Sequence, residues 1–247
     1  MKKIIEICCG SYEDCLNAAA GHADRIELNS ALHLGGLTPS IGTLRLARSH
    51  VNLPIICMVR PRGAGFCYTE TEYKAMIADA EALLESGADG LAFGFLNEDG
   101  SIDAARTQSF SHLIHSYGKE AVFHRAFDCV EDPYLSMELL IESGIDRVLT
   151  SGLQAKAYEG RTLIKKLQQR YGNFIQILAG SGVNASNAKD LMQETGILQI
   201  HSSCKTWLKD PTTHRNKNVT YAYAAGEQEL CYDAVSVDLV KELVQSI

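Results

Sequence analysis

The stretch Ser86-Gly87-Ala88-Asp89-Gly90-Leu91-Ala92-Phe93-Gly94-Phe95-Leu96 ends a helical pattern and begins a short apolar strand. Glycine at position 87 fits the left-handed backbone position that commonly closes a helix. Matching segments recur before two other apolar runs, as Gly21-His22-Ala23-Asp24 and as Ser143-Gly144-Ile145-Asp146. This repetition predicts a fold built from like units, in which each helix leads into a strand.

Strand-like runs alternate with helical patterns along the whole chain, which is typical of repeated βα units on a parallel sheet. Eight strands are expected, at residues 4–9, 25–29, 55–61, 90–96, 121–128, 147–152, 174–180 and 198–202. Eight strands favour a closed α/β barrel of the (β/α)8 or TIM type. The alternative, a doubly wound open sheet, would usually carry fewer strands and a glycine-rich first turn, and Cys9-Gly10-Ser11 is no dinucleotide fingerprint.

Length and composition agree with one barrel domain covering residues 1–247, since such barrels have about 250 residues. Residues 205–232 are expected to form an extended loop after the eighth strand. The net charge of −7 argues against nucleic acid as a partner. We expect no membrane span and a cytoplasmic location, because the sequence has no run of eighteen apolar residues and no signal-peptide pattern near its start. A homodimer is expected from the general frequency of such assemblies.

Polar side chains gather where the predicted strands end, and the active sites of barrels lie at that end. The pattern predicts a catalytic group of His124, Glu6, Glu27 and Asp128. His124 is the expected general acid or base, with the carboxylates orienting it or sharing proton transfer. The alternative is structural: Glu6 and Glu27 would form buried ion pairs with Arg60 or Arg125, and His124 would be a hydrogen-bonded core histidine.

A second set of residues predicts a pocket for a small anion. Two guanidinium groups flank a proline beside a flexible glycine loop, which suits carboxylate or phosphate. Another glycine-rich loop follows the seventh strand, where barrels often bind phosphate. The predicted ligand-binding residues are Arg60, Arg62, Arg125, Ser151, Gly180, Ser181, Gly182, His201 and Ser202.

Six ordered segments resemble the CutC family of copper homeostasis proteins. They are Arg25-Ile26-Glu27-Leu28, Gly35-Gly36-Leu37-Thr38-Pro39-Ser40, Arg60-Pro61-Arg62-Gly63, Phe123-His124-Arg125-Ala126-Phe127-Asp128, Leu149-Thr150-Ser151-Gly152 and His201-Ser202-Ser203. The resemblance implies a cytoplasmic β/α barrel associated with copper tolerance, in which cysteines have been proposed to bind Cu(I) and no reaction is established.

Soft thiolates select Cu(I), and Cys8, on the same face as Glu6, is the expected metal ligand. Many members of the family carry a cysteine at the position of Asn29. In this chain Cys67, after the third strand, is the predicted substitute for that ligand. Three functions therefore stay open: copper binding, an enzyme acting on a small phosphorylated or carboxylated metabolite, and a ligand sensor without turnover. If the protein is not a copper binder, no cofactor is expected.

Overall fold

The computed structural model describes residues 2–212, 215–216, 218–219 and 221–247. Eight parallel strands close into a barrel in chain order, so the (β/α)8 prediction is confirmed. The strands are β1 (Ile4–Cys9), β2 (Arg25–Leu28), β3 (Ile55–Met58), β4 (Gly90–Phe93), β5 (Glu120–Phe123), β6 (Arg147–Thr150), β7 (Gln176–Ala179) and β8 (Gln199–Ser202).

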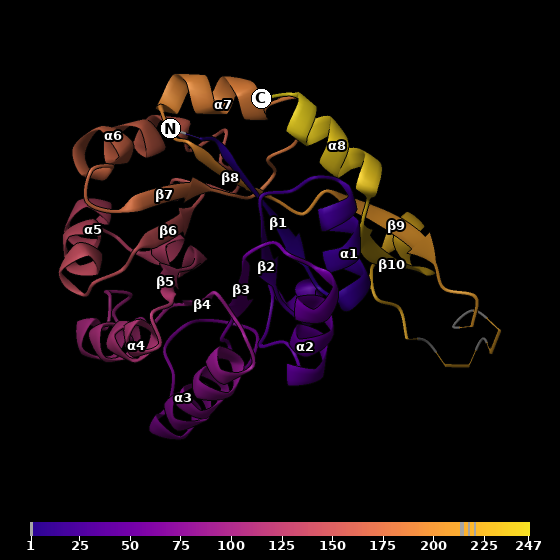
Figure 1. Ribbon diagram of the computed structural model, residues 1–247, viewed down its shortest axis with the longest axis horizontal. Helices are drawn as coiled ribbons and strands as arrows, with labels where there is room; N and C mark the ends of the chain where they lie inside the picture. The colour runs from indigo at the N-terminus through magenta and orange to yellow at the C-terminus, as the bar shows by residue number, and fades with distance from the viewer. Residues whose placement is uncertain (1, 213–214, 217, 220) are drawn as a thin grey trace.

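Helices surround the barrel as an outer ring (Figure 1). They are α1 (Tyr12–Ala20), α2 (Ile41–His50), α3 (Glu70–Glu85), α4 (Ala104–Ser116), α5 (Pro133–Glu142), α6 (Arg161–Tyr171), α7 (Ala188–Thr195) and α8 (Val237–Gln245). Side-chain hydrogen bonds cap the first turns of several of these helices. Thr69 and Glu72 form a capping box at α3, and Asp132 caps α5 just before Pro133. None of the described helices has the length and apolar character that crossing a bilayer requires.

The barrel interior is layered. Its lower layer consists of the first residues of five strands, which form a hydrogen-bonded chain: Arg25 to Gln199, Gln199 to Gln176, Gln176 to Arg147, and Arg147 to Glu120. A small apolar layer of Ile56, Met58, Ala92 and Val122 lies above it. We call the lower layer the polar floor. The floor and the apolar layer fill the amino end, and a cavity lies at the carboxyl ends of the strands.

Several predicted strands extend past the observed ends, and two segments differ in kind. The strand predicted over residues 121–128 ends at Phe123, and a 3₁₀ helix, Arg125–Cys129, follows it. His124 caps this helix by accepting the Ala126 N–H at Nδ1. Local capping therefore ends the strand, and residues 124–129 do not follow the side-chain alternation of a strand.

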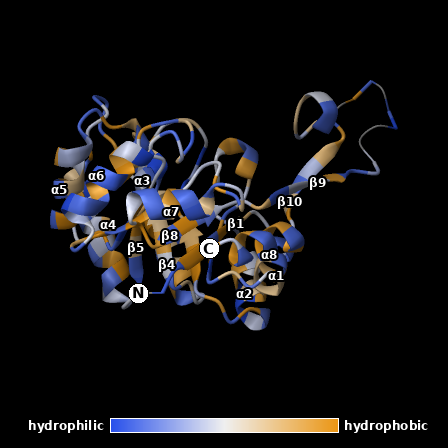
Figure 2. Ribbon diagram, turned by 90° about the horizontal axis from the view of Figure 1, so that it is seen from above, coloured by the Kyte–Doolittle hydropathy of each residue, from blue (hydrophilic) through white to orange (hydrophobic). Residues whose placement is uncertain are grey.

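The second difference concerns residues 205–232, of which 213, 214, 217 and 220 lie outside the described residues. The expected irregular loop instead contains an antiparallel ribbon of β9 (Lys205–Lys209) and β10 (Cys231–Val235). This ribbon, which we call the arm, projects sideways from the barrel (Figure 2). Most residues of β9 are exposed, so no buried face imposed the alternation by which strands are recognised in a sequence.

Gly90 tests how closely the interior is packed. A Cβ atom there would lie 2.6 Å from the carbonyl oxygen of Glu120 and 2.8 Å from Cδ1 of Ile56. Gly90→Ala should therefore lower the free energy of unfolding by about 2 kcal/mol. Urea denaturation measures this change. Gly65→Ala is the matched control, because no heavy atom lies within 4 Å of its added Cβ, and equal losses in both variants would contradict the packing described.

Candidate functional site

A cavity of about 120 Å³ opens at the carboxyl ends of the strands. Its lining combines residues from strand ends with residues of the loops after β2 and β3. They are Cys8, Glu27, Asn29, Gly35, Met58, Arg60, Phe66, His124, Arg125, Leu149 and His201. Of the predicted site residues, six therefore meet in one place: Cys8, Glu27, Arg60, His124, Arg125 and His201.

Glu6 lies beside this cavity and joins three strands. Its carboxylate is 2.5 Å from Nε of Arg25 on β2 and 2.8 Å from Nδ1 of His201 on β8. Burial opposes the charge of Glu6, but Arg25 and His201 outweigh it and hold the pKa of Glu6 well below its usual range. The structural alternative foresaw a buried ion pair for Glu6 but assigned the wrong partner, which is Arg25 rather than Arg60 or Arg125.

His201 lies between two carboxyl groups. Its Nδ1 contacts Glu6, and its Nε2 is 3.9 Å from Oε2 of Glu27. Burial alone lowers the pKa of His201, but the charge of Glu27 and the hydrogen bonds with Cys8 and Glu6 raise it well above 6.5. The pKa of Glu27 is itself raised, chiefly by burial. Both shifts favour the protonated form of each group, next to Cys8.

The thiol of Cys8 completes this cluster. Its Sγ is 3.7 Å from Oε2 of Glu27, and Asn29 Nδ2 approaches Sγ at 3.5 Å. Burial raises the pKa of the Cys8 thiol. One donor atom each from Cys8, Glu27 and His201 lie within 4.8 Å of one another, a spacing that can hold a metal ion. Cys67 is exposed and does not line the cavity, so the structure does not bring it to Cys8.

Arg60 and His124 form the opposite wall with Phe66. The Arg60 guanidinium is buried and donates to the carbonyls of Leu34, Gly36 and Ala64. Burial, with the charge of Arg60, lowers the pKa of His124 to about 3. Because Nδ1 accepts the Ala126 N–H, the proton of the neutral ring lies on Nε2. His124 is therefore arranged as a hydrogen-bond donor, and its low pKa does not suit the predicted general acid or base.

Asp128, Arg125 and Ser151 form a separate hydrogen-bonded group. Asp128 pairs with Nε of Arg125 at 2.7 Å and accepts from Thr150 Oγ1, from Ser151 N and Oγ, and from Leu153 N. Asp128 does not line the cavity, and its oxygens hold the loop after β6. Arg125 lines the cavity, with its charge already paired.

Arg62 is also engaged elsewhere. It forms an ion pair with Glu72, donates to the carbonyls of Gly63, Gly65 and Cys67, and packs over the ring of Tyr68. These contacts hold the loop after β3 and leave Arg62 outside the cavity lining. The adjacent arginines of the sequence thus have different roles, because Arg60 turns inward and Arg62 turns toward the first turn of α3.

The predicted anion loop faces a different cavity, of about 430 Å³, whose lining includes Gly182, Asn184, Ser202, Lys205 and Glu242. Ser202 Oγ donates to the carbonyl of Val183, and Ser181 Oγ donates to that of Ala155. A Cβ at Gly180 would lie 2.7 Å from Cδ1 of Leu149 and 3.3 Å from His201, so Gly180 makes room for both side chains. The single anion pocket expected from the sequence is therefore two separate spaces.

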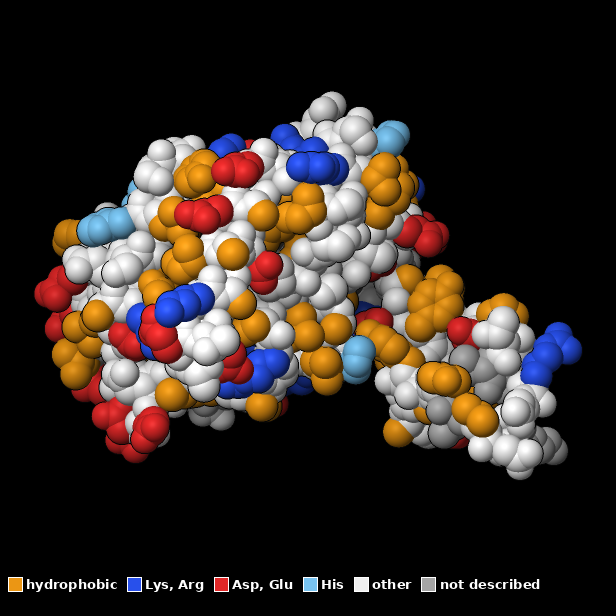
Figure 3. Space-filling model, turned by 90° about the horizontal axis from the view of Figure 1, so that it is seen from below, with side chains coloured by type: hydrophobic (Ala, Val, Ile, Leu, Met, Phe, Trp, Pro, Cys, Tyr) orange, Lys and Arg blue, Asp and Glu red, His pale blue; other side chains and the backbone are white. Residues whose placement is uncertain are grey.

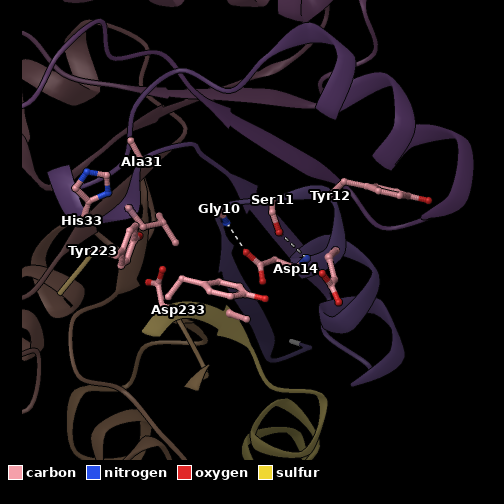
Figure 4. Close-up of a pocket in the computed structure, with 12 residues that line it drawn as sticks. Gly10, Ser11, Tyr12, Asp14, Ala31, His33, Tyr223 and Asp233 are labelled. Atoms are coloured by element: carbon pink, nitrogen blue, oxygen red, sulfur yellow. Dashed lines mark hydrogen bonds between the residues drawn. The ribbon is translucent and has the colours of Figure 1, made fainter. Parts of the chain in front are cut away.

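A third cavity, of about 440 Å³, lies where the base of the arm meets the loops after β1 and β2 (Figure 4). Asp14 accepts the N–H groups of Gly10 and Val235 and so ties α1 to the arm. Tyr223 packs edge-on against His33, and burial and a hydrogen bond to Asp233 raise its pKa to about 12. This cavity was not predicted, because Tyr223 comes from the segment expected to be a loop.

The sequence model of the CutC family matches residues 3–206. The chain belongs to the CutC family. A family protein CutC from Treponema denticola is 44% identical over the full length of both chains. A human protein named copper homeostasis protein cutC homolog is 37% identical over 97% of this chain and 87% of its own length.

Solved structures agree. The crystal structure of a protein provisionally named copper homeostasis protein CutC, from Streptococcus agalactiae, superimposes with a TM-score of 0.77 at 30% identity, covering 81% of this chain and 98% of that one. KGPDC from Streptococcus mutans, at 11% identity and a TM-score of 0.62, shares the fold alone. The match to the CutC family model ends at residue 206, within β9, so most of the arm lies beyond it.

The buried neutral His124 predicts a pH dependence of stability. Between pH 6.5 and about 3 the unfolded chain binds a proton at this residue and the folded protein does not, so stability falls as the pH falls. From pH 7 to pH 5 this residue alone should cost about 2 kcal/mol. The measurement is urea denaturation at both pH values.

Between pH 7 and pH 5 the free energy of unfolding should fall by about 2 kcal/mol less in the His124→Gln variant than in the wild type. The exposed His112→Gln serves as the control and should behave like the wild type. If His124→Gln and wild type lose stability in parallel, the histidine is not held neutral in the fold.

Proposed function

We propose that this CutC family protein takes part in copper homeostasis in the cytoplasm by binding one Cu(I) ion at Cys8 and His201. The observation that carries the proposal is the cluster of one thiol, one imidazole and one carboxyl group within 4.8 Å beside the cavity. Thiolate and imidazole are donors that copper accepts, and thiolate favours Cu(I) over hard cations. Glu27 has a carboxylate, which is a harder donor, and it would orient the side chains around the ion.

The surroundings of His201 support a ligand role. Metal-binding histidines commonly donate their second ring nitrogen to a carboxylate, which fixes the ring's orientation. Glu6 accepts from Nδ1 of His201 at 2.8 Å, and this contact directs Nε2 toward Glu27 and Cys8. Asn29, at the position where many family members carry cysteine, donates to Glu27 at 2.9 Å and supports this side of the cluster.

Copper binding at this cluster would release protons. The pKa values of Cys8 and His201 are both raised, so both donors carry protons near neutral pH. A metal ion must displace these protons, and its affinity should therefore rise with pH.

Anaerobic titration with Cu(I) against a competing chelator tests the proposal. We expect one equivalent to bind to the wild type, Cys8→Ser to abolish binding, and affinity to increase from pH 6 to pH 8. Cys67→Ser is the matched control, because Cys67 is an exposed thiol outside the cavity. Binding that survives in Cys8→Ser, or that is lost in Cys67→Ser, would refute this site.

The alternative proposal is an enzyme acting on a small carboxylated or phosphorylated metabolite in the same cavity. One observation favours it: Glu27, whose pKa is raised, faces His201, and the two groups can exchange a proton. In this version the acid and base are Glu27 and His201, and His124 is the donor that polarises the substrate. Loss of turnover in Glu27→Gln with Cu(I) affinity retained would favour the enzyme.

We also propose a homodimer that uses the arm. Trp207, Leu208, Leu230 and Tyr232 are exposed on it, and the arm forms a lobe of its own with apolar side chains on its surface (Figure 3). Exposed apolar patches of this kind commonly mark contacts between proteins.

Sedimentation velocity measures the assembly. We expect a dimer for the wild type and a monomer for Leu208→Asp. Leu135→Asp, at an exposed apolar residue of α5 on the barrel, is the control and should stay dimeric. A monomeric wild type, or a dimer that Leu208→Asp leaves intact, would exclude the arm as the contact.

A further inference from the structure

The wall of the cavity opposite Cys8 holds a buried positive charge that no carboxylate balances. Arg60 is 5% exposed, and the hydrogen bonds of its guanidinium go to backbone carbonyls. Phe66 lies 5.0 Å from the guanidinium carbon. No Asp or Glu in the described part of the chain lies within ion-pair distance of Arg60. Buried charges in proteins are ordinarily paired, so this arginine lacks a counterion.

His124, on the same wall, has an unused donor. Its ring is 3% exposed, and Nδ1 is occupied by the Ala126 N–H. The other nitrogen, Nε2, carries the proton of the neutral ring and has no hydrogen-bond partner among the residues that the structure describes. A buried N–H without an acceptor costs about as much as a lost hydrogen bond, which indicates that something else supplies the acceptor.

The remaining charges of the cavity are matched among themselves. Arg125 is paired with Asp128, and the two cations Arg25 and His201 balance the two carboxylates Glu6 and Glu27. Arg60 therefore leaves the cavity with one positive charge in excess. A ligand with a single negative charge and an oxygen acceptor would satisfy both Arg60 and His124.

We propose that this wall binds the carboxylate of a small organic acid, with His124 Nε2 donating a hydrogen bond to it and Arg60 supplying the counter-charge. The cavity, at about 120 Å³, is well below the 300–1,000 Å³ of sites for drug-sized ligands, which favours a small ligand. A monocarboxylate fits better than phosphate, because the second charge of a phosphate would face Glu27 across the cavity. The carboxylate would contact Arg60 and His124, whereas the copper site uses Cys8 and His201 on the other wall of the same cavity.

The test uses the protein labelled with ¹⁵N-histidine, in which NMR reports Nε2 of His124 directly. Acetate and glycolate should shift this resonance with saturation, whereas neutral acetamide and sodium chloride at equal ionic strength should not. His124→Phe should weaken acetate binding, measured by calorimetry, about tenfold or more, since it removes a hydrogen bond to a charged group. His124→Gln, which keeps a side-chain N–H donor, should recover part of that loss.

Two cross-controls separate this proposal from the copper site. Cys67→Ser, outside the cavity, should bind acetate as the wild type does, and His124→Phe, which leaves Cys8 and His201 in place, should still bind Cu(I). No shift of His124 Nε2 with either carboxylate would overturn the proposal, as would phosphate binding tighter than acetate or acetate binding unchanged in His124→Phe. If the wild type binds no Cu(I), the copper proposal fails, but the carboxylate result is unaffected.

Discussion

The contact on which the site depends is the Glu6 carboxylate held between Arg25 and His201. In the barrel register Glu6 of β1 lies opposite Arg25 of β2 and His201 of β8, so one carboxylate ties three adjacent strands together. Removing one partner from such a buried group leaves the others uncompensated, at a cost of about 3–5 kcal/mol. The same contact fixes the orientation and charge of His201. Strand register and site chemistry are therefore set by one interaction.

Arg25 also connects the site to the polar floor, because it donates both to Glu6 and to Gln199. The floor continues through Gln176 to Arg147, which is 1% exposed. A barrel that carried only apolar residues at these positions would close equally well but would give Glu6 no partner. The polar floor thus explains how a charged carboxylate can lie beneath a cavity whose other half is lined by Met58, Phe66 and Leu149.

Much of this could be predicted from the sequence. The eight strands follow from repeated helix–strand junctions, and Cys8, Glu27 and His201 could be placed together because strand ends meet at one edge of a barrel. The errors share a cause. Each depends on a side-chain contact that sequence periodicity does not encode. These contacts are the capping of a 3₁₀ helix by His124, the ion pair of Glu6 with Arg25, and the ion pair of Arg62 with Glu72. The arm was missed because an exposed ribbon carries no hydrophobic alternation.

The two walls of the cavity respond to pH in different ways. On the Cys8 wall both prospective ligands hold protons, so a cation competes with protons and gains affinity as the pH rises. On the Arg60 wall His124 stays neutral with its proton on Nε2 down to about pH 3, so a carboxylate meets the same donor across the physiological range. Acidification therefore weakens the metal side, while the His124 donor on the anion side stays the same. Glu27 is the group that connects them: as it takes up a proton, its repulsion of an incoming carboxylate falls, and the cavity shifts its preference from cation to anion.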